Sequence, residues 1–163
     1  MNLRTLFGII LSTATLSLSA CASFDIGNAN RDVDPGQAAK SLDLVNHGDI
    51  AWGGVIVNGK NLSDSTELEV LAYPLDSNNR PSIDEKPTGR FIAVKSGYLE
   101  VADYAPGREI TIVGKVHRVR DGKVGDAKYT YPILEAQTLN LWSKERGKSD
   151  PQLHFGFGIS VIH

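Results

Sequence analysis

The chain has 163 residues, 41% of them hydrophobic, and a formal net charge of −2 from 17 lysines and arginines against 19 acids. This is the composition of one globular domain, without the basic excess that nucleic-acid binding requires, so we expect no nucleic-acid partner. Only one cysteine is present, at position 21, which excludes an internal disulfide. The fold must therefore be stabilised by packing alone.

The N-terminus has the features of a secretory signal. Arg4 is followed by an apolar stretch over residues 6–18 and by small residues. The stretch is shorter than the roughly 20 apolar residues that a membrane-spanning helix needs. The residues Leu18, Ser19, Ala20 and Cys21 match a lipobox, the site at which a bacterial lipoprotein precursor is cleaved and its cysteine is lipidated.

Lipidation of Cys21 would make the membrane a partner of this protein. Stable anchoring takes two or more acyl chains, which a bacterial lipoprotein carries. Residue 22 is Ala rather than Asp. By the sorting rule for enterobacterial lipoproteins, this favours the outer membrane, and we expect the domain on its periplasmic face. The predicted organisation is a cleaved signal peptide (residues 1–20), a lipidated N-terminus with a flexible tether (21–34) and one folded domain (35–163).

The folded domain should begin with a short helix. Asp34, Pro35 and Gln37 have the types and spacing of an N-cap, a first helical residue and a capping box. Apolar residues then recur at helical spacing as far as Val45, which predicts two to three turns.

From residue 50 onward the pattern predicts strands. Gly53 and Gly54 inside the first strand indicate a bulge or a sharp bend, and Asp121-Gly122 indicates a hairpin turn. The expected strands are residues 50–57, 66–73, 89–95, 97–101, 109–120, 128–142 and 152–163. The predicted fold class is mainly β, a small antiparallel OB-like barrel with one short N-terminal helix, and a β-sandwich is the alternative.

The last expected strand, residues 152–163, alternates apolar residues with Gly, Ser and His. We predict that it pairs as an edge strand of the barrel with Phe155 and Phe157 facing the core. The alternative is an exposed segment that touches lipid headgroups or a partner.

No catalytic constellation is evident. The four histidines are scattered without the spacing of a metal site, and no serine lies in a nucleophile elbow. Glu67 and Glu69 share one strand face, which we interpret as solvated rather than as an acid/base pair. We therefore expect no enzyme, metal or cofactor, and a hydrolase remains the least favoured class.

Arg80, Arg90 and Arg108 each lie beside a Pro or Gly turn. Arginine binds carboxylates and phosphates in bidentate geometry, so these three residues are the candidates for contact with an envelope protein or polymer. The alternative, which we favour, is that they form internal pairs with Asp76 or Asp103 and fix loops.

A set of short motifs runs through the middle of the chain: Trp52-Gly53-Gly54, Tyr73-Pro74-Leu75-Asp76, Arg80-Pro81, Gly89-Arg90-Phe91, Gly97-Tyr98-Leu99, Tyr104, Pro106-Gly107-Arg108 and Ile110-Thr111-Ile112-Val113-Gly114. With these motifs, the stretch from Gly53 to Gly114 resembles the Slp family of outer-membrane lipoproteins. The resemblance implies an outer-membrane lipoprotein of the kind linked to starvation and stationary phase, and it implies no catalytic mechanism. A periplasm-facing module that binds a small ligand or an envelope polymer is the alternative function.

Overall fold

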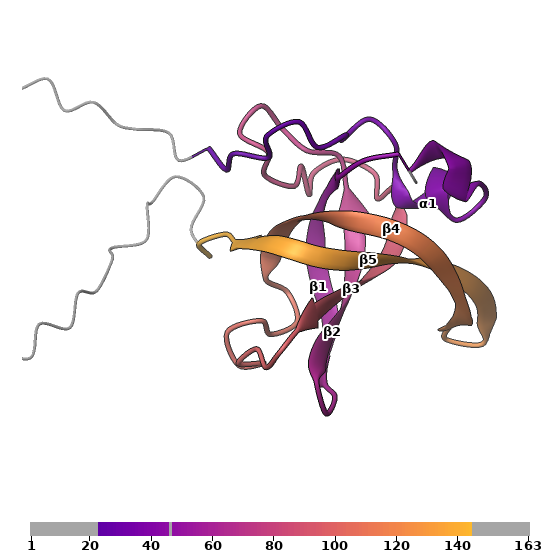
Figure 1. Cartoon of the computed structure of the whole chain (residues 1–163). Coiled ribbons are helices and arrows are strands. Elements are labelled where there is room, and N and C mark those ends of the chain that lie inside the picture. Colours follow the sequence, from indigo (N-terminus) through magenta and orange to yellow (C-terminus); the bar gives the residue numbers. More distant parts are fainter. Residues whose placement is uncertain (1–22, 46, 145–163) are drawn as a thin grey trace, which may run out of the picture.

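A computed structural model describes residues 23–45 and 47–144. A one-turn helix α1 (Pro35–Ala38) and a 3₁₀ helix η1 (Leu42–Leu44) precede five strands. The strands are β1 (Ile50–Asn61), β2 (Ser65–Tyr73), β3 (Gly89–Ser96), β4 (Glu109–Val124) and β5 (Ala127–Leu141). Figure 1 shows β4 and β5 curving across the other three strands and continuing beyond them as a hairpin.

The five strands close into a barrel in the order β1-β2-β3-β5-β4, with β4 returning to β1. The neighbours β3 and β5 are parallel over Ile92–Val94 and Ile133–Glu135, and the other four pairings are antiparallel. This is the arrangement of a five-stranded OB-type barrel. The predicted fold class is thus confirmed, and the β-sandwich alternative is wrong.

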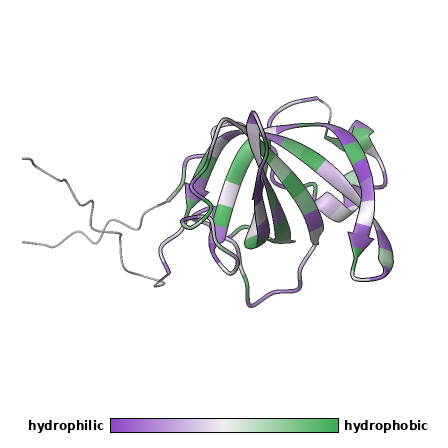
Figure 2. Ribbon diagram, turned by 90° about the horizontal axis from the view of Figure 1, so that it is seen from below, coloured by the Kyte–Doolittle hydropathy of each residue, from purple (hydrophilic) through white to green (hydrophobic). Residues whose placement is uncertain are grey.

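Alternation of side chains along the strands produces the core. On β2, Leu68, Val70 and Ala72 are at most 1% exposed, while the residues between them are partly exposed. Figure 2 shows the same alternation of apolar and polar residues on the curved strands. In the barrel interior the rings of Trp52 and Phe91 meet with their centroids 5.2 Å apart. Burial of apolar surface, aliphatic and aromatic, is the main stabilising term that a chain without disulfides has.

Two glycines allow strands to pass unusually close to each other. A Cβ on Gly54 would lie 2.0 Å from the carbonyl oxygen of Leu71, and one on Gly114 would lie 2.1 Å from that of Glu135. Both obstacles are backbone atoms that cannot turn aside. The bulge that we expected at Gly53 and Gly54 lies instead at Val57, where the β1–β2 register shifts. Gly53 and Gly54 are therefore needed because their neighbours pack too closely for a Cβ, and not because the strand bulges there.

Local turns differ from expectation in three places. The predicted capping box at Asp34 and Gln37 is present, but α1 ends after four residues. The β4–β5 turn is at Gly125 and Asp126, so Asp121-Gly122 belongs to β4. A Gly-Asp pair suits a two-residue hairpin, and Gly125 takes the positive φ of 58° that such a turn requires. Residues 97–101, where we expected a short strand, contain none.

The predicted signal peptide, the lipobox with Cys21 and the apolar segment at residues 152–163 lie outside the described residues.

Candidate functional site

The N-terminal strap, residues 23–34, lies against one end of the barrel. We expected a flexible tether here, but its described part is hydrogen-bonded to the domain. Asn30 pairs in parallel with Ile50 at the start of β1, its N–H donating to Asp49 O at 2.8 Å. The indole Nε1 of Trp52 donates to Val33 O at 2.6 Å. A polar composition predicted mobility, but main-chain groups of the strap find partners on β1 and Trp52.

The β2–β3 loop, residues 74–88, holds the strap at its first residues and again at Arg31. The N–H of Phe24 donates to Asn78 O at 3.1 Å, and Asn79 Nδ2 donates to Phe24 O at 2.9 Å. The guanidinium of Arg31 donates to Asp76 O at 3.1 Å, to Leu75 O at 3.2 Å and to the side-chain oxygen of Asn79. These five bonds fasten the strap at Phe24 and at Arg31, and Phe24 is only three residues from position 21.

A tight turn inside this loop presents those acceptors. The Asp76 carboxylate accepts the N–H groups of Asn78 at 2.8 Å and Arg80 at 2.9 Å. Asn79 has a φ of 62°, a left-handed conformation that Asn tolerates better than most residues. Leu75 and Pro81 form an antiparallel bridge across the base of the turn. The turn is thus held by contacts within the loop itself, and the contacts to the strap are additional.

Arg80 joins the same loop to the start of β4 and the end of β5. Its Nε donates to Glu109 Oε2 at 2.6 Å, and its Nη2 donates to Ser143 O at 3.0 Å. The guanidinium also lies 5.5 Å from the ring centroid of Trp142, a cation–π contact. Both members of the ion pair are only 13% exposed. Arg80 therefore has an internal partner, although that partner is Glu109 and not Asp76.

A buried hydroxyl connects these contacts. Thr111 on β4 is fully buried, and its Oγ1 donates to Asn79 O at 2.7 Å. The same oxygen accepts the indole Nε1–H of Trp142 at 2.9 Å. A chain of contacts thus runs from Phe24 through Asn79 and Thr111 to Trp142 and fixes the loop, the strap and the end of β5 together.

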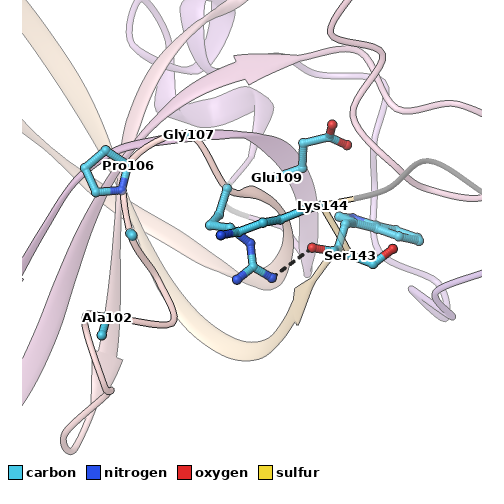
Figure 3. A pocket seen from close by; sticks show the side chains of 9 residues that line it. Ala102, Pro106, Gly107, Glu109, Ser143 and Lys144 are labelled. Carbon is cyan, nitrogen blue, oxygen red and sulfur yellow. Dashed lines mark hydrogen bonds between the residues drawn. The ribbon is translucent and has the colours of Figure 1, made fainter. Parts of the chain in front are cut away.

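Arg108 lines a small pocket at residues 102–109 and 142–144, shown in Figure 3. Its guanidinium donates to Asp103 O at 3.1 Å and Trp142 O at 3.0 Å, so it caps backbone carbonyls rather than an acid side chain. Figure 3 shows the Glu109 carboxylate turned away from the rest of the lining, consistent with its pair to Arg80. The pocket volume of about 210 Å³ is below the usual range of small-molecule sites, roughly 300–1,000 Å³.

Arg90 belongs to a separate group on the outer face of β2. Its Nη1 donates to Glu69 Oε1 at 2.7 Å, and the hydroxyl of Tyr131 donates to the same oxygen at 3.2 Å. Burial and the Glu69 charge raise the pKa of Tyr131 above its ordinary value. Arg120 forms two bonds of 2.8 and 3.0 Å to Glu67. The glutamates that we interpreted as solvated are both paired with arginines.

The charge of Arg120 changes the acidity of Glu67. Its two hydrogen bonds lower the pKa of the Glu67 carboxyl, and the same contact raises the pKa of Arg120. Arg120 is 42% exposed, so solvent weakens this pair relative to the one between Arg80 and Glu109.

The three arginines therefore do not converge on one pocket. Arg80 and Arg108 bind neighbouring carbonyls at the end of β5, whereas Arg90 lies on the β2 face. Sequence reasoning missed Arg31, Asn79 and Glu109, whose partners are distant in the chain. The local signal for Asn79 was its place in a polar Asp-Ser-Asn-Asn turn.

Within residues 23–45 and 47–144, no three His, Cys, Asp or Glu side chains gather as metal ligands would. In the same ranges no helix has the length and apolarity that crossing a bilayer requires.

Comparison with known proteins identifies relatives in two bacteria. The uncharacterized lipoprotein YeaY of Escherichia coli (strain K12) is 29% identical over 139 residues, 83% of this chain and 72% of that protein. Outer membrane protein Slp of the same strain is 26% identical over 140 residues, 83% and 74% of the two chains. An uncharacterized protein of Haemophilus influenzae is 32% identical over 118 residues, 71% of this chain and 61% of that one.

Among solved structures, a small single-stranded DNA-binding protein from Streptomyces coelicolor aligns with a TM-score of 0.37 and 18% identity, over 59% of this chain and 94% of that one. A likeness this distant carries no argument about function. The model of the outer membrane lipoprotein Slp family matches residues 18–158, which include all the contacts described above. The chain therefore belongs to the outer membrane lipoprotein Slp family.

Proposed function

We propose that this protein is anchored in the outer membrane by lipid on Cys21 and has a non-enzymatic role in the cell envelope. The observation that carries the proposal is the family match, which begins at residue 18 and so includes Leu18, Ser19, Ala20 and Cys21. In this proposal residues 1–20 are removed as a signal peptide. Cys21 becomes the first residue, and the barrel lies on the periplasmic side.

The arrangement of charged groups supports a structural rather than a catalytic role. Arg80, Arg90 and Arg120 each have a carboxylate partner, and Arg108 binds two carbonyl oxygens. The three ion pairs join segments that are distant in the chain, so each has a structural explanation that needs no substrate. With the family resemblance, we place the role in envelope maintenance under starvation or in stationary phase.

Metabolic labelling with palmitate tests the anchor. The wild-type chain should take up label and sediment with outer membranes, and Cys21→Ser should do neither. Globomycin, which blocks the lipoprotein signal peptidase, should cause the precursor to accumulate. A wild-type chain that is processed without label would refute the anchor.

A matched variant tests the choice of membrane. Ala22→Asp keeps the lipobox and changes only the residue after the lipidated cysteine. The labelled protein should then move from the outer-membrane to the inner-membrane fraction. Unchanged fractionation would mean that residue 22 does not direct sorting in this protein.

Protease accessibility tests the face of the membrane. Protease should reach the barrel only after the outer membrane is opened, and digestion in intact cells would place the barrel on the outer face.

A further inference from the structure

The described end of the strap is separated from the proposed lipid by very few residues. Only Ala22 and Ser23 separate Cys21 from Phe24, whose main-chain N–H and C=O groups are both bonded to the β2–β3 loop. Three residues of fully extended chain span at most about 11 Å. The headgroup layer is itself about 5–8 Å deep on each side of the bilayer, so this loop cannot move far from it.

We propose that the anchor face, made of the strap (residues 23–34) and the β2–β3 loop (residues 74–88), lies against the phospholipid headgroups and gives the barrel one fixed orientation on the membrane. The proposal rests on lipidation of Cys21. A small domain is about 30 Å across, almost three times the reach of the linker, so only the face that holds Phe24 can be membrane-proximal.

The strap is bonded to the barrel and to the β2–β3 loop along its length, so a lipid at its start restricts the orientation of the whole barrel. Phe24 and Arg31 bind the β2–β3 loop, Asn30 pairs with β1, and Val33 accepts the Trp52 indole. The described C-terminal end is held at the same face, where Arg80 binds Ser143 O. Figures 1 and 2 agree that both described ends leave the barrel on one side and that the β4–β5 hairpin projects on the other.

The charges of the anchor face indicate which kind of lipid headgroup it can lie against. The strap carries three aspartates and one arginine, and the loop adds three acids and two basic residues. An acidic surface has no electrostatic attraction to anionic lipids. The contact is therefore imposed by the covalent anchor, and its partner is a zwitterionic phospholipid surface. Without the lipid, the domain should not bind vesicles.

Fluorophore quenching on the full lipidated chain tests the orientation. Because Cys21 would carry the lipid, an introduced cysteine is the only free thiol. Ser77→Cys and Ile83→Cys place the thiol at exposed positions of the anchor face. Ala127→Cys, at an exposed position of the β4–β5 hairpin, is the matched control. In phosphatidylethanolamine vesicles with a headgroup nitroxide, labels at 77 and 83 should be quenched several-fold more than the label at 127. Equal quenching at all three positions would overturn the proposal.

Two further variants test whether the short strap causes the orientation. A twelve-residue Gly/Ser insertion between Ala22 and Ser23 adds about 20 Å of reach and should abolish the difference in quenching. The pair Arg31→Gln and Asn79→Gly removes the side-chain clamps, and glycine keeps the left-handed turn. This pair should reduce the difference while the β-sheet circular dichroism of the barrel is unchanged. Quenching that survives both changes would show that the strap does not orient the domain.

Failure of the lipid anchor gives a different result from failure of the orientation. If Cys21 is not lipidated, the parent chain without an added cysteine reacts with the thiol label. If it is lipidated, the parent chain stays unlabelled and only the quenching pattern decides. Unlipidated Cys21→Ala should not sediment with the vesicles, and sedimentation would overturn the claim that the covalent anchor imposes the contact.

Discussion

Arg80 Nε and Glu109 Oε2, 29 residues apart in the chain, form a 2.6 Å ion pair that joins the β2–β3 loop to the first residue of β4. Both side chains are 13% exposed, so each has lost most of its contact with water. Removing one member of a buried pair leaves an uncompensated charge, at a cost of about 3–5 kcal/mol in fully buried cases.

We expect Arg80→Met to lower the free energy of unfolding by about 3 kcal/mol, because it removes the bonds to Glu109 and Ser143 at a site that is only 13% exposed. Arg120→Met is the matched control, since Arg120 is 42% exposed and such pairs contribute about 0.2–1 kcal/mol. Urea unfolding of both variants measures the difference. Equal losses would mean that burial does not distinguish the two pairs.

Gly54→Ala should destabilise the barrel by about 3 kcal/mol, the upper part of the range for overpacking. The added methyl would lie 2.0 Å from Leu71 O, which is held in the β1–β2 ladder and cannot rotate away. Gly48→Ala is the control, because nothing lies within 4 Å of that position. Thermal melting of the two variants checks this, and a wild-type melting temperature for Gly54→Ala would contradict the strand spacing.

The Glu67–Arg120 pair should make stability depend on pH in the acid range. Arg120 holds the folded-state pKa of Glu67 below its ordinary value, so the carboxylate's contribution is complete above about pH 5, where Glu67 is ionised in the unfolded chain as well. It is lost as the pH falls through the lowered folded pKa. Because the pair is partly exposed, the effect should be about 0.5 kcal/mol.

Glu67→Gln should therefore flatten the stability curve between about pH 5 and pH 3, measured by urea unfolding at each pH. Glu135→Gln, at an exposed position of β5, is the control for removing a carboxylate as such. The same slope in Glu67→Gln and wild type would show that this pair does not contribute to acid sensitivity.

Trp52→Phe should loosen the strap and leave the barrel folded. Phenylalanine keeps the ring that packs on Phe91 but removes the indole N–H that donates to Val33 O, a loss of about 1 kcal/mol. Hydrogen exchange should accelerate in residues 23–34. In the control Tyr131→Phe, which removes a hydroxyl bonded to Glu69 and leaves the Val33 contact intact, that segment should exchange as in wild type. Unchanged exchange in Trp52→Phe would show that the indole does not hold the strap.

Local features were predicted well because their causes are local. The capping box of Asp34 and Gln37 involves residues three apart, and both of its hydrogen bonds are present. The alternation on β2 likewise gave the correct buried face. The hairpin turn was misplaced because Asp121-Gly122 and Gly125-Asp126 both have turn chemistry, and only the pairing of β4 with β5 selects between them.

The sequence by itself determined where the five strands of the described residues lie, the OB-like barrel and the family, because apolar periodicity and short motifs can be read directly along the chain. Only the tertiary structure decided the partners of the arginines and the place of residues 23–34. Those contacts join groups up to 63 residues apart, as in Arg80 and Ser143, and no local pattern encodes such pairs. A polar segment predicts a tether by composition, but the main-chain N–H and C=O of Phe24 are bonded to Asn78 and Asn79, 54 and 55 residues away. Main-chain polar groups that leave water need such partners, and only the folded chain supplies them.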